Sequence, residues 1–417
     1  QEIGEYFKKI DSLITFHHRK SNLFNKTCRN AWEQRKLGDV AEYRNGKAHE
    51  NEIDDDGEYI VVNSKFVSTN GEIKKFSNAQ NEPLYENEIA FVLSDVPNGR
   101  AIARTFLIEK SGKYTLNQRI AGITPHEDTD PYYLHIKMNR NAYFLKFDDG
   151  NKQTNLSIKD VLNYEDMYPN YKEQQKIGNY FRSLDHLITL HQRKYDETKK
   201  LKKCMLQKMF PKEGEKVPEI RFSGFTGDWK QRKFGDMVII ERGGSPRPID
   251  KFITEDENGL SWVKIGDAPE QGNYITRTKE KIKTEGLSKT REVHPGDLIL
   301  SNSMSFGRPY IMAIDGCIHD GWLLIRDHEK KFDLKYLCCM LGTDMMLFQY
   351  KQMAAGSTVN NLNKELVGNT VVKYPSPAEQ SKIGVYFSTL DGIITLHKKK
   401  CDELRNIKKF MLQNMFI

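Results

Sequence analysis

Arginine, lysine, asparagine and glutamine side chains occur in several turn-forming segments of the sequence. Arginine and lysine can donate to guanine edges and to phosphates, and asparagine and glutamine can pair with adenine. Any one of these residues taken alone is better explained as an ordinary turn or surface residue, so a DNA-binding hypothesis rests on the sets. The candidates are Arg44, Lys47, Lys65, Arg100, Arg119, Lys152 and Gln153 in the first half, and Arg242, Arg247, Lys264, Arg308 and Asn360 in the second.

Catalytic chemistry has little support in the sequence. The run of acidic residues at 54–56 followed by Glu72 and Lys74 loosely resembles a nuclease metal site, but the second half has no counterpart. A methyltransferase would need a glycine-rich cofactor turn and an Asn-Pro-Pro-Tyr-like loop, and the chain contains no Asn-Pro pair. None of the 6 cysteines forms a Cys-x-x-Cys pair, so structural zinc is not expected. We therefore expect no catalytic or metal-binding residues.

The composition suits a folded protein of two or three domains. The chain has 417 residues, of which 38% are hydrophobic and 29% are charged, so each part can bury a core. The formal charge of +7 suits an acidic partner without identifying one. The sequence contains no run of 18 apolar residues, so it predicts no membrane-spanning helix. With several cysteines in apolar surroundings and no visible signal peptide, the sequence predicts a cytoplasmic protein.

The elements that must position the candidate residues are revealed by an internal repeat. Residues 174–210 and 380–416 align without a gap, and a shorter copy opens the chain at 1–20. A second repeated block, WEQRKLGD at Trp32 and WKQRKFGD at Trp229, precedes each long copy. A repeat of this kind indicates two similar domains, each followed by the same long segment.

The long copies are predicted to be helices that pair as a coiled coil. Apolar or seam residues recur every seven positions, which is typical of a coiled-coil stripe. The first row is Ile177, Leu184, His191, Thr198 and Met205 in one copy, and Ile383, Leu390, His397, Leu404 and Met411 in the other. We expect a second row at Tyr180, Leu187 and Leu201, and at Tyr386, Ile393 and Ile407. The intervening domain returns the chain, so an antiparallel pair is expected, with the two histidines packed in it rather than binding a metal.

Each block before a long helix mixes strands with one helix. The apolar runs that predict strands are 58–62, 89–93 and 101–108 in the first block, and 298–300, 310–314 and 322–325 in the second. Helical spacing covers 131–147 and 333–352. The framework repeats, for instance Gly99-Arg100 against Gly307-Arg308, whereas the polar loops differ. Two similar frameworks with different polar loops favour two modules that recognise different DNA sequences.

The motifs KIGxYFxxLDxxITLH, VPEIRFSGFTGDW at 217–229 and the helix ends LKKCMLQKMF and IKKFMLQNMF give the chain a close resemblance to specificity subunits of type I restriction–modification enzymes. The resemblance spans nearly the whole chain. It implies an α+β fold with two similar globular target-recognition domains separated by two long antiparallel coiled-coil helices. The expected parts are a truncated helix copy at 1–30, domain 1 at 31–172, helix 1 at 173–210, a linker at 211–228, domain 2 at 229–378 and helix 2 at 379–417.

The resemblance also implies partners and a division of labour. Each domain would recognise one half of a bipartite, asymmetric site in double-stranded DNA, and the helices would set the gap. Two methyltransferase subunits would dock on the helices and domains, and restriction subunits would join them. S-adenosylmethionine, ATP and Mg²⁺ would belong to those partners, so this chain would be no enzyme. Two alternatives are a coiled-coil scaffold that binds only proteins and an endonuclease with its own active site.

Overall fold

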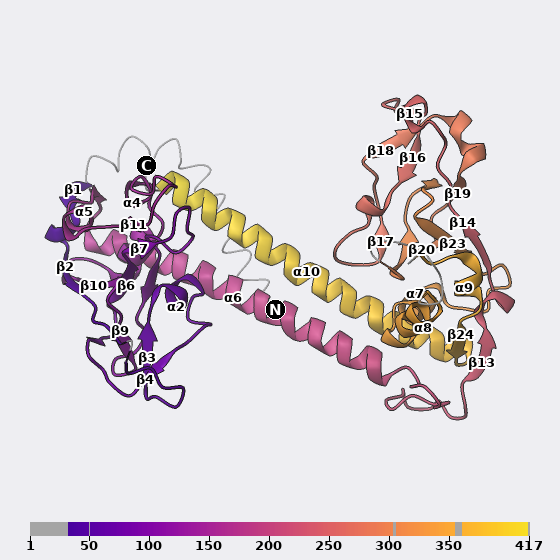
Figure 1. The fold of residues 1–417 in the computed structure, drawn as a ribbon, viewed down its shortest axis with the longest axis horizontal. Helices are drawn as coiled ribbons and strands as arrows, with labels where there is room; N and C mark the ends of the chain where they lie inside the picture. Colours follow the sequence, from indigo (N-terminus) through magenta and orange to yellow (C-terminus); the bar gives the residue numbers. More distant parts are fainter. Residues whose placement is uncertain (1–31, 50, 303–305, 355–360, 416–417) are drawn as a thin grey trace. The chain divides into compact units, whose positions relative to one another are not determined.

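The computed structural model describes residues 32–49, 51–302, 306–354 and 361–415. The chain divides into two compact units (Figure 1). Unit 1 comprises residues 1–187 and 404–417, and unit 2 comprises residues 188–403. Two long helices, α6 (Tyr171–Lys208) and α10 (Pro377–Met415), each contribute residues to both units. The expected leading copy at 1–20 lies outside the described residues.

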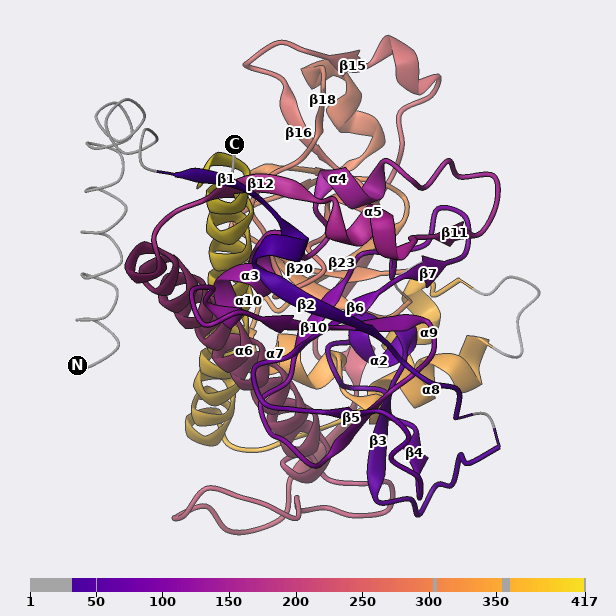
Figure 2. The same cartoon turned by 90° about the vertical axis from the view of Figure 1, so that its left-hand side faces the viewer.

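The described part of unit 1 contains two four-stranded sheets and two short strand pairs. Figure 2 shows three neighbouring strands of the first sheet, β2, β10 and β6, side by side. The first sheet has the order β2 (Ala41–Asn45), β10 (Ile120–Pro125), β6 (Ile89–Val92) and β8 (Thr105–Leu107). The second has the order β4 (Phe76–Ser77), β3 (Tyr59–Val62), β9 (Tyr114–Leu116) and β5 (Pro83–Leu84). The pairs are β1 (Glu33–Lys36) with β12 (Glu165–Tyr168), and β7 (Ser94–Asp95) with β11 (Thr154–Asn155). The short helices are α2 (Ser64–Ser68), α3 (Pro131–Met138), α4 (Ala142–Leu145) and α5 (Ile158–Leu162).

The described part of unit 2 also has two sheets, which are wider because each has five strands. The first has the order β14 (Ile239–Arg242), β23 (Trp322–Arg326), β20 (Leu298–Ser301), β21 (Pro309–Met312) and β17 (Tyr274–Ile275). The second has the order β15 (Ile253–Thr254), β18 (Glu280–Ile282), β16 (Leu260–Val263), β22 (Gly316–Ile318) and β19 (Arg291–Val293). A pair, β13 (Lys230–Lys233) with β24 (Val371–Tyr374), matches β1 with β12. The helices are α7 (Leu334–Leu341), α8 (Asp344–Ala354) and α9 (Lys364–Gly368). The expected α+β class and the repeated domain are confirmed.

Local structure departs from the sequence prediction at three places. The segment 131–147 forms α3 and α4 rather than one helix, because Asn139 is extended and Arg140 has a φ of 58°. The segment 333–352 is likewise divided into α7 and α8 at Gly342. The strand expected at 101–108 begins only at Thr105, because Ala103 adopts a φ of 56°.

Cross-helix contacts within each unit show that α6 and α10 are antiparallel, as expected. In unit 2, His191 and His397 face each other with 2.9 Å between their Nδ1 atoms, and Lys202 pairs with Asp391 at 2.5 Å. In unit 1, Lys408 pairs with Asp185 at 2.6 Å. The two lysine–aspartate pairs occupy equivalent positions of the repeat, because Asp391 and Lys408 lie 206 residues after Asp185 and Lys202, the spacing that separates the two histidines.

The buried face of the long helices differs from the predicted second row. Leu201 is 46% exposed and Ile393 is 36% exposed, whereas Phe181 and Phe387 are fully buried. The second row thus lies one residue later, at the four-residue spacing, which a seven-residue repeat permits equally well. The physical reason is that each helix also packs on a domain: Phe387 belongs to the core of unit 2, where its ring lies 6.1 Å from that of Phe210.

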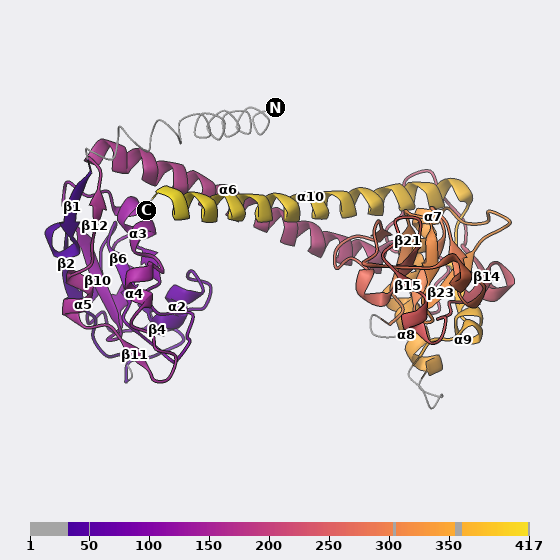
Figure 3. The ribbon, with the colours of Figure 1, turned by 90° about the horizontal axis from the view of Figure 1, so that it is seen from above.

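One joint attaches a domain to its long helix in both units. In unit 1 the buried Gln174 of α6 accepts from the N–H of Asp130, and Asp130 caps α3 by accepting from Tyr133 N–H at 2.8 Å. In unit 2 the buried Gln380 of α10 makes the same bond to Asp333, the cap of α7. Figure 3 shows α7 beside α10. The motif that begins each long copy, with its glutamine, therefore serves to hold the domain.

We predict that acid destabilises the fold, because His191 and His397 are packed between the two long helices. Burial lowers the pKa of both His191 and His397, and nearby positive charges act in the same direction: His397 and Lys400 on His191, and Lys194 on His397. Because the pKa values in the folded state lie below the ordinary value of 6.5, the unfolded chain takes up protons first as the pH falls through that value. We expect the free energy of unfolding to decrease from pH 7.5 to pH 5, as measured by denaturant titration.

The double variant His191→Leu/His397→Leu should lose part of this decrease. His294→Gln is the matched control, because His294 is exposed and Asp315 raises its pKa. An identical pH dependence of the wild type and the double variant would contradict the prediction.

Candidate nucleic-acid interface

In each unit, polar side chains lie at one end of the strands of the first sheet. We call this end of the sheet the shared edge, because each unit has one. In unit 1, β2 and β6 end at this edge and β8 and β10 begin there, because all neighbouring strands of this sheet are antiparallel. In unit 2, β14 and β20 end at the corresponding edge, and β21 and β23 begin there. The turns that join these strands project from the edge, where side chains can reach a ligand.

A close backbone contact at the shared edge explains a glycine that both units contain. A Cβ atom on Gly46 would lie 2.1 Å from the carbonyl oxygen of Asn117, and one on Gly243 would lie 2.2 Å from that of His319. No side chain fits at either position. The contact therefore fixes the turn before β10 against the end of β2, and the turn before β23 against the end of β14.

One backbone hydrogen bond in each unit identifies the residues of the two shared edges that correspond to each other. The N–H of Leu93 donates to the carbonyl of Arg119 at 3.1 Å, and that of Asn302 donates to Gly321 at 3.0 Å. These bonds show which residues correspond: Leu93 corresponds to Asn302, and Arg119 corresponds to Gly321. The corresponding positions with different side chains are Asn45 and Arg242, Leu93 and Asn302, Asn117 and His319, Gln118 and Asp320, and Arg119 and Gly321.

The shared edge of unit 2 is organised around Asp320. Its carboxylate accepts from Ser245 Oγ at 2.8 Å and lies 2.9 Å from His319 Nε2. Its backbone carbonyl accepts from Asn302 Nδ2 at 2.8 Å and from Arg242 Nε at 3.3 Å. This cluster presents acceptors and donors together, which suits hydrogen bonding to base edges. Sequence reasoning missed Ser245 and Asn302, because only the strand register brings them to Asp320.

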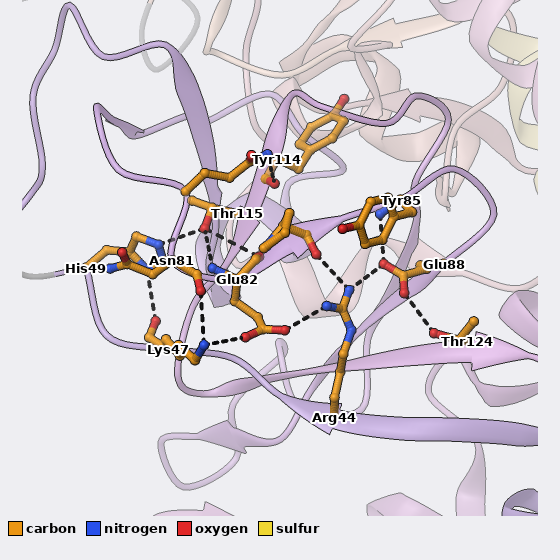
Figure 4. Close-up of polar contacts among 12 residues, drawn as sticks. Arg44, Lys47, His49, Asn81, Glu82, Tyr85, Glu88, Tyr114, Thr115 and Thr124 are labelled. Carbon is orange, nitrogen blue, oxygen red and sulfur yellow. Dashed lines mark hydrogen bonds and ion pairs between the residues drawn. The ribbon is translucent and has the colours of Figure 1, made fainter.

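Two of the predicted residues, Arg44 and Lys47, lie in an internal ion-pair network of unit 1 (Figure 4). The guanidinium of Arg44 donates to Glu82 at 2.7 Å and to the buried Glu88 at 2.5 Å. Lys47 pairs with Glu82 at 3.0 Å and donates to the carbonyl of Asn81 at 3.2 Å. The network ties β2 to the loop before β6, so the fold alone accounts for Arg44.

The other predicted residues fall into four groups. Among the residues that the structure describes, no ion pair joins the exposed side chains of Lys65, Arg100, Arg119, Lys152 and Arg247 to a carboxylate. Three others are engaged within their own unit: Gln153 Nε2 donates to Ser94 Oγ at 2.7 Å, Lys264 pairs with Glu280, and Arg308 donates to the carbonyls of Glu270 and Gly272. Arg242 takes part in the Asp320 cluster. Asn360 lies outside the described residues.

The structure also corrects which residue of unit 1 corresponds to Arg308. Val92 N–H donates to the carbonyl of Arg104, and Ser301 N–H donates to that of Arg308. Because Val92 and Ser301 pair with corresponding residues of β10 and β23, Arg308 corresponds to Arg104 and not to Arg100. The sequence pairing of Gly99-Arg100 with Gly307-Arg308 was therefore wrong by four residues, because the two loops differ in length.

Described residues provide neither a metal cluster nor a membrane helix. No group of three or more His, Cys, Asp or Glu side chains in the described ranges has the arrangement of a metal site. In the acidic run, Asp54 instead accepts from Asn78 Nδ2 and from the N–H of Asp56. None of the helices in the described part of the chain is long and apolar enough to cross a membrane.

Comparison with known proteins gives a consistent result. A family model for the type I restriction modification DNA specificity domain matches twice, at residues 30–200 and 226–406. The chain is 22% identical over 399 residues to the type I restriction enzyme MjaVIII specificity subunit of Methanocaldococcus jannaschii, covering 91% of this chain and 90% of that protein. The putative MjaX specificity subunit of the same organism is 21% identical over 403 residues, covering 91% of each.

Solved structures support the fold. The S subunit of a type I restriction-modification system from M. genitalium matches with a TM-score of 0.63 at 15% identity, covering 93% of this chain and 96% of that one. At this identity the likeness concerns the fold alone.

Proposed function

The chain belongs to the family of type I restriction–modification DNA specificity subunits, and we propose that its two domains recognise different halves of one bipartite, asymmetric DNA site. One observation supports this most: the shared edges have the same backbone bonds and different side chains at corresponding positions. A scaffold that binds only proteins would have no need for two such edges. The matched framework with altered donors and acceptors is what recognition of two sequences requires.

We propose further that this chain supplies recognition and leaves catalysis to its partners. Methyl transfer would be carried out by two methyltransferase subunits with S-adenosylmethionine, and DNA cleavage by restriction subunits with ATP and Mg²⁺. In unit 2, α10 exposes Val385 and Leu396, each 53% accessible, and these apolar side chains support a protein contact there. The helices would also set the gap between the two half-sites.

Exchange of one domain tests the assignment. We expect that replacing residues 229–372 with the second domain of another family member, in a complex with the methyltransferase subunits, changes one half-site and leaves the other unchanged. The backbone contacts at the shared edge and at the joint are internal to each unit, so the first domain should keep its specificity. The measurement is a map of methylated positions on genomic DNA.

The purified chain with S-adenosylmethionine but without methyltransferase subunits is the control, and it should transfer no methyl groups. A change in both half-sites would refute independent recognition, and methyl transfer by the chain alone would refute the non-catalytic role.

A further inference from the structure

Three arginines converge beside the shared edge of unit 1, on the loop that leads from β7 to β8. Arg104 Nε donates to the carbonyl of Arg100 at 2.6 Å. Arg140, which follows α3, donates from Nη1 to the carbonyl of Ile102 at 3.2 Å and to that of Gly99 at 3.4 Å. The loop carbonyls thus hold two guanidinium groups close to a third arginine, a set that the sequence distributes over 41 positions.

Unusual backbone conformations make this convergence possible. Ala103 has a φ of 56° and Arg140 has a φ of 58°, in the left-handed region that side-chain-bearing residues rarely adopt. The N–H of Arg140 donates to the carbonyl of Ala103 at 2.8 Å, so the two strained residues hold each other. Strain of this kind is retained where the surrounding structure enforces it, often at binding sites.

The positive charges of Arg100 and Arg140 act on Arg104. Burial and the charges of Arg140 and Arg100 lower the pKa of Arg104. Within the described ranges, no ion pair connects any of the three to a carboxylate. The nearby Asp95 carboxylate instead accepts from three backbone N–H groups of its own loop, including those of Ala101 and Ile102. An anionic ligand would relieve the repulsion among the guanidinium groups.

The position of the cluster fits the backbone of bound DNA. Arg104 directly precedes β8, and β6 lies between β8 and β10 in the sheet. The cluster is therefore two strand spacings, about 10 Å, along the shared edge from the turn that contains Gln118 and Arg119. The major groove is about 12 Å wide. A turn that contacts bases in the groove would leave the cluster beside the flanking phosphates.

Among the described residues of unit 2, the arginine that corresponds to Arg104 belongs to no such cluster. Arg308, which corresponds to Arg104, donates to the carbonyls of Glu270 at 3.0 Å and Gly272 at 3.2 Å, and its guanidinium lies 5.0 Å from the centre of the Tyr310 ring. That arginine is used to hold the loop before β17. Corresponding arginines thus have different contacts in the two units, although the units share one framework.

We propose that Arg100, Arg104 and Arg140 form a phosphate clamp, which binds a backbone phosphodiester flanking the half-site recognised by the first domain. This inference rests on the proposed function, because it requires DNA at the shared edge. The clamp contributes affinity and register without base specificity. It adds to the salt dependence of binding at the first half-site.

The test uses the complex with methyltransferase subunits and a DNA duplex that contains the mapped site. Arg104→Gln and Arg140→Asn remove the charge, and asparagine tolerates the left-handed conformation of residue 140. Each variant should make the slope of log affinity against log salt shallower by up to about 0.9, the value for complete loss of one phosphate contact. The methylated sequence should stay the same. Arg104→Lys, which keeps the charge, should retain most of the slope, and Arg232→Gln, an exposed arginine on β13, should retain all of it.

Single methylphosphonate substitutions, which are neutral, locate the contact. One position beside the first half-site should weaken binding by the wild type and have no further effect on Arg104→Gln. Unchanged salt slopes in both variants, or a relaxed sequence in the first half-site, would overturn the clamp. Impaired assembly with the methyltransferase subunits and a normal salt slope would also overturn it, in favour of an acidic protein partner. If the wild-type complex lacks sequence-specific binding, the proposed function itself fails.

Discussion

Insertion of seven residues into both long helices is expected to widen the gap between the two half-sites by about three base pairs, while both half-site sequences stay the same. Seven helical residues add about 10 Å, and three base pairs of duplex span about the same length. The insertions are placed after Thr198 in α6 and after Leu404 in α10. Each lies between the two lysine–aspartate contacts on its helix, so Asp185 with Lys408 and Lys202 with Asp391 are retained.

The register of the helix pair provides the control for this experiment. A heptad returns the buried stripe to the same face of the helix, whereas two residues rotate it by about 200°. We therefore expect the two-residue insertion to abolish folding or assembly. The gap of the heptad variant is measured by mapping methylated positions in a host genome. An active complex with an unchanged gap would show that the helices do not determine the spacing.

Substitution of the glycine in the domain–helix joint is expected to destabilise the protein, although alanine favours helix formation. A Cβ atom on Gly384 would lie 2.6 Å from Asp333 Oδ1 and 2.8 Å from the N–H nitrogen of Tyr336, the two atoms of the α7 cap. Gly178 meets Asp130 Oδ1 at the same 2.6 Å in unit 1. Loss of the cap bond costs about 1 kcal/mol, and overpacking adds roughly 1–3 kcal/mol. We expect Gly384→Ala to reduce the free energy of unfolding by about 2 kcal/mol after the gain in helix propensity.

Gly392 on the same helix is the matched control. A Cβ atom there would have no neighbour within 4 Å, so Gly392→Ala should stabilise the protein by up to about 1 kcal/mol. The free energy of unfolding of both variants is measured in the full chain by denaturant titration, with hydrogen exchange of α7 and α10 as the signal. Effects of the same sign at the two positions would contradict the assigned role of the joint.

The sequence predicted well what depends on local residues and on repetition. The seven-residue period predicted the two long helices, and the repeat predicted two similar domains. Apolar runs predicted β3, β6, β20, β21 and β23 closely, because buried strands depend on side chains that neighbour one another along the chain.

The candidate site was predictable only in part. Arg119 and Arg242 were candidates from the sequence, and the structure places both at a shared edge. Arg104 and Asn302 escaped notice. Nothing local distinguishes an arginine that follows a left-handed alanine from any other surface arginine.

By itself, the sequence determined the organisation of this protein: its repeated domains, its paired helices and the family to which it belongs. Only the tertiary structure decided which residues correspond across the repeat, that Phe181 and Phe387 rather than Tyr180 and Tyr386 are buried, and that Arg104 and Arg140 meet. The reason is that strand register is fixed by hydrogen bonds between residues far apart in the chain. Where the loops of the two units differ in length, an alignment of their sequences can be displaced by a few residues although both units form the same hydrogen bonds.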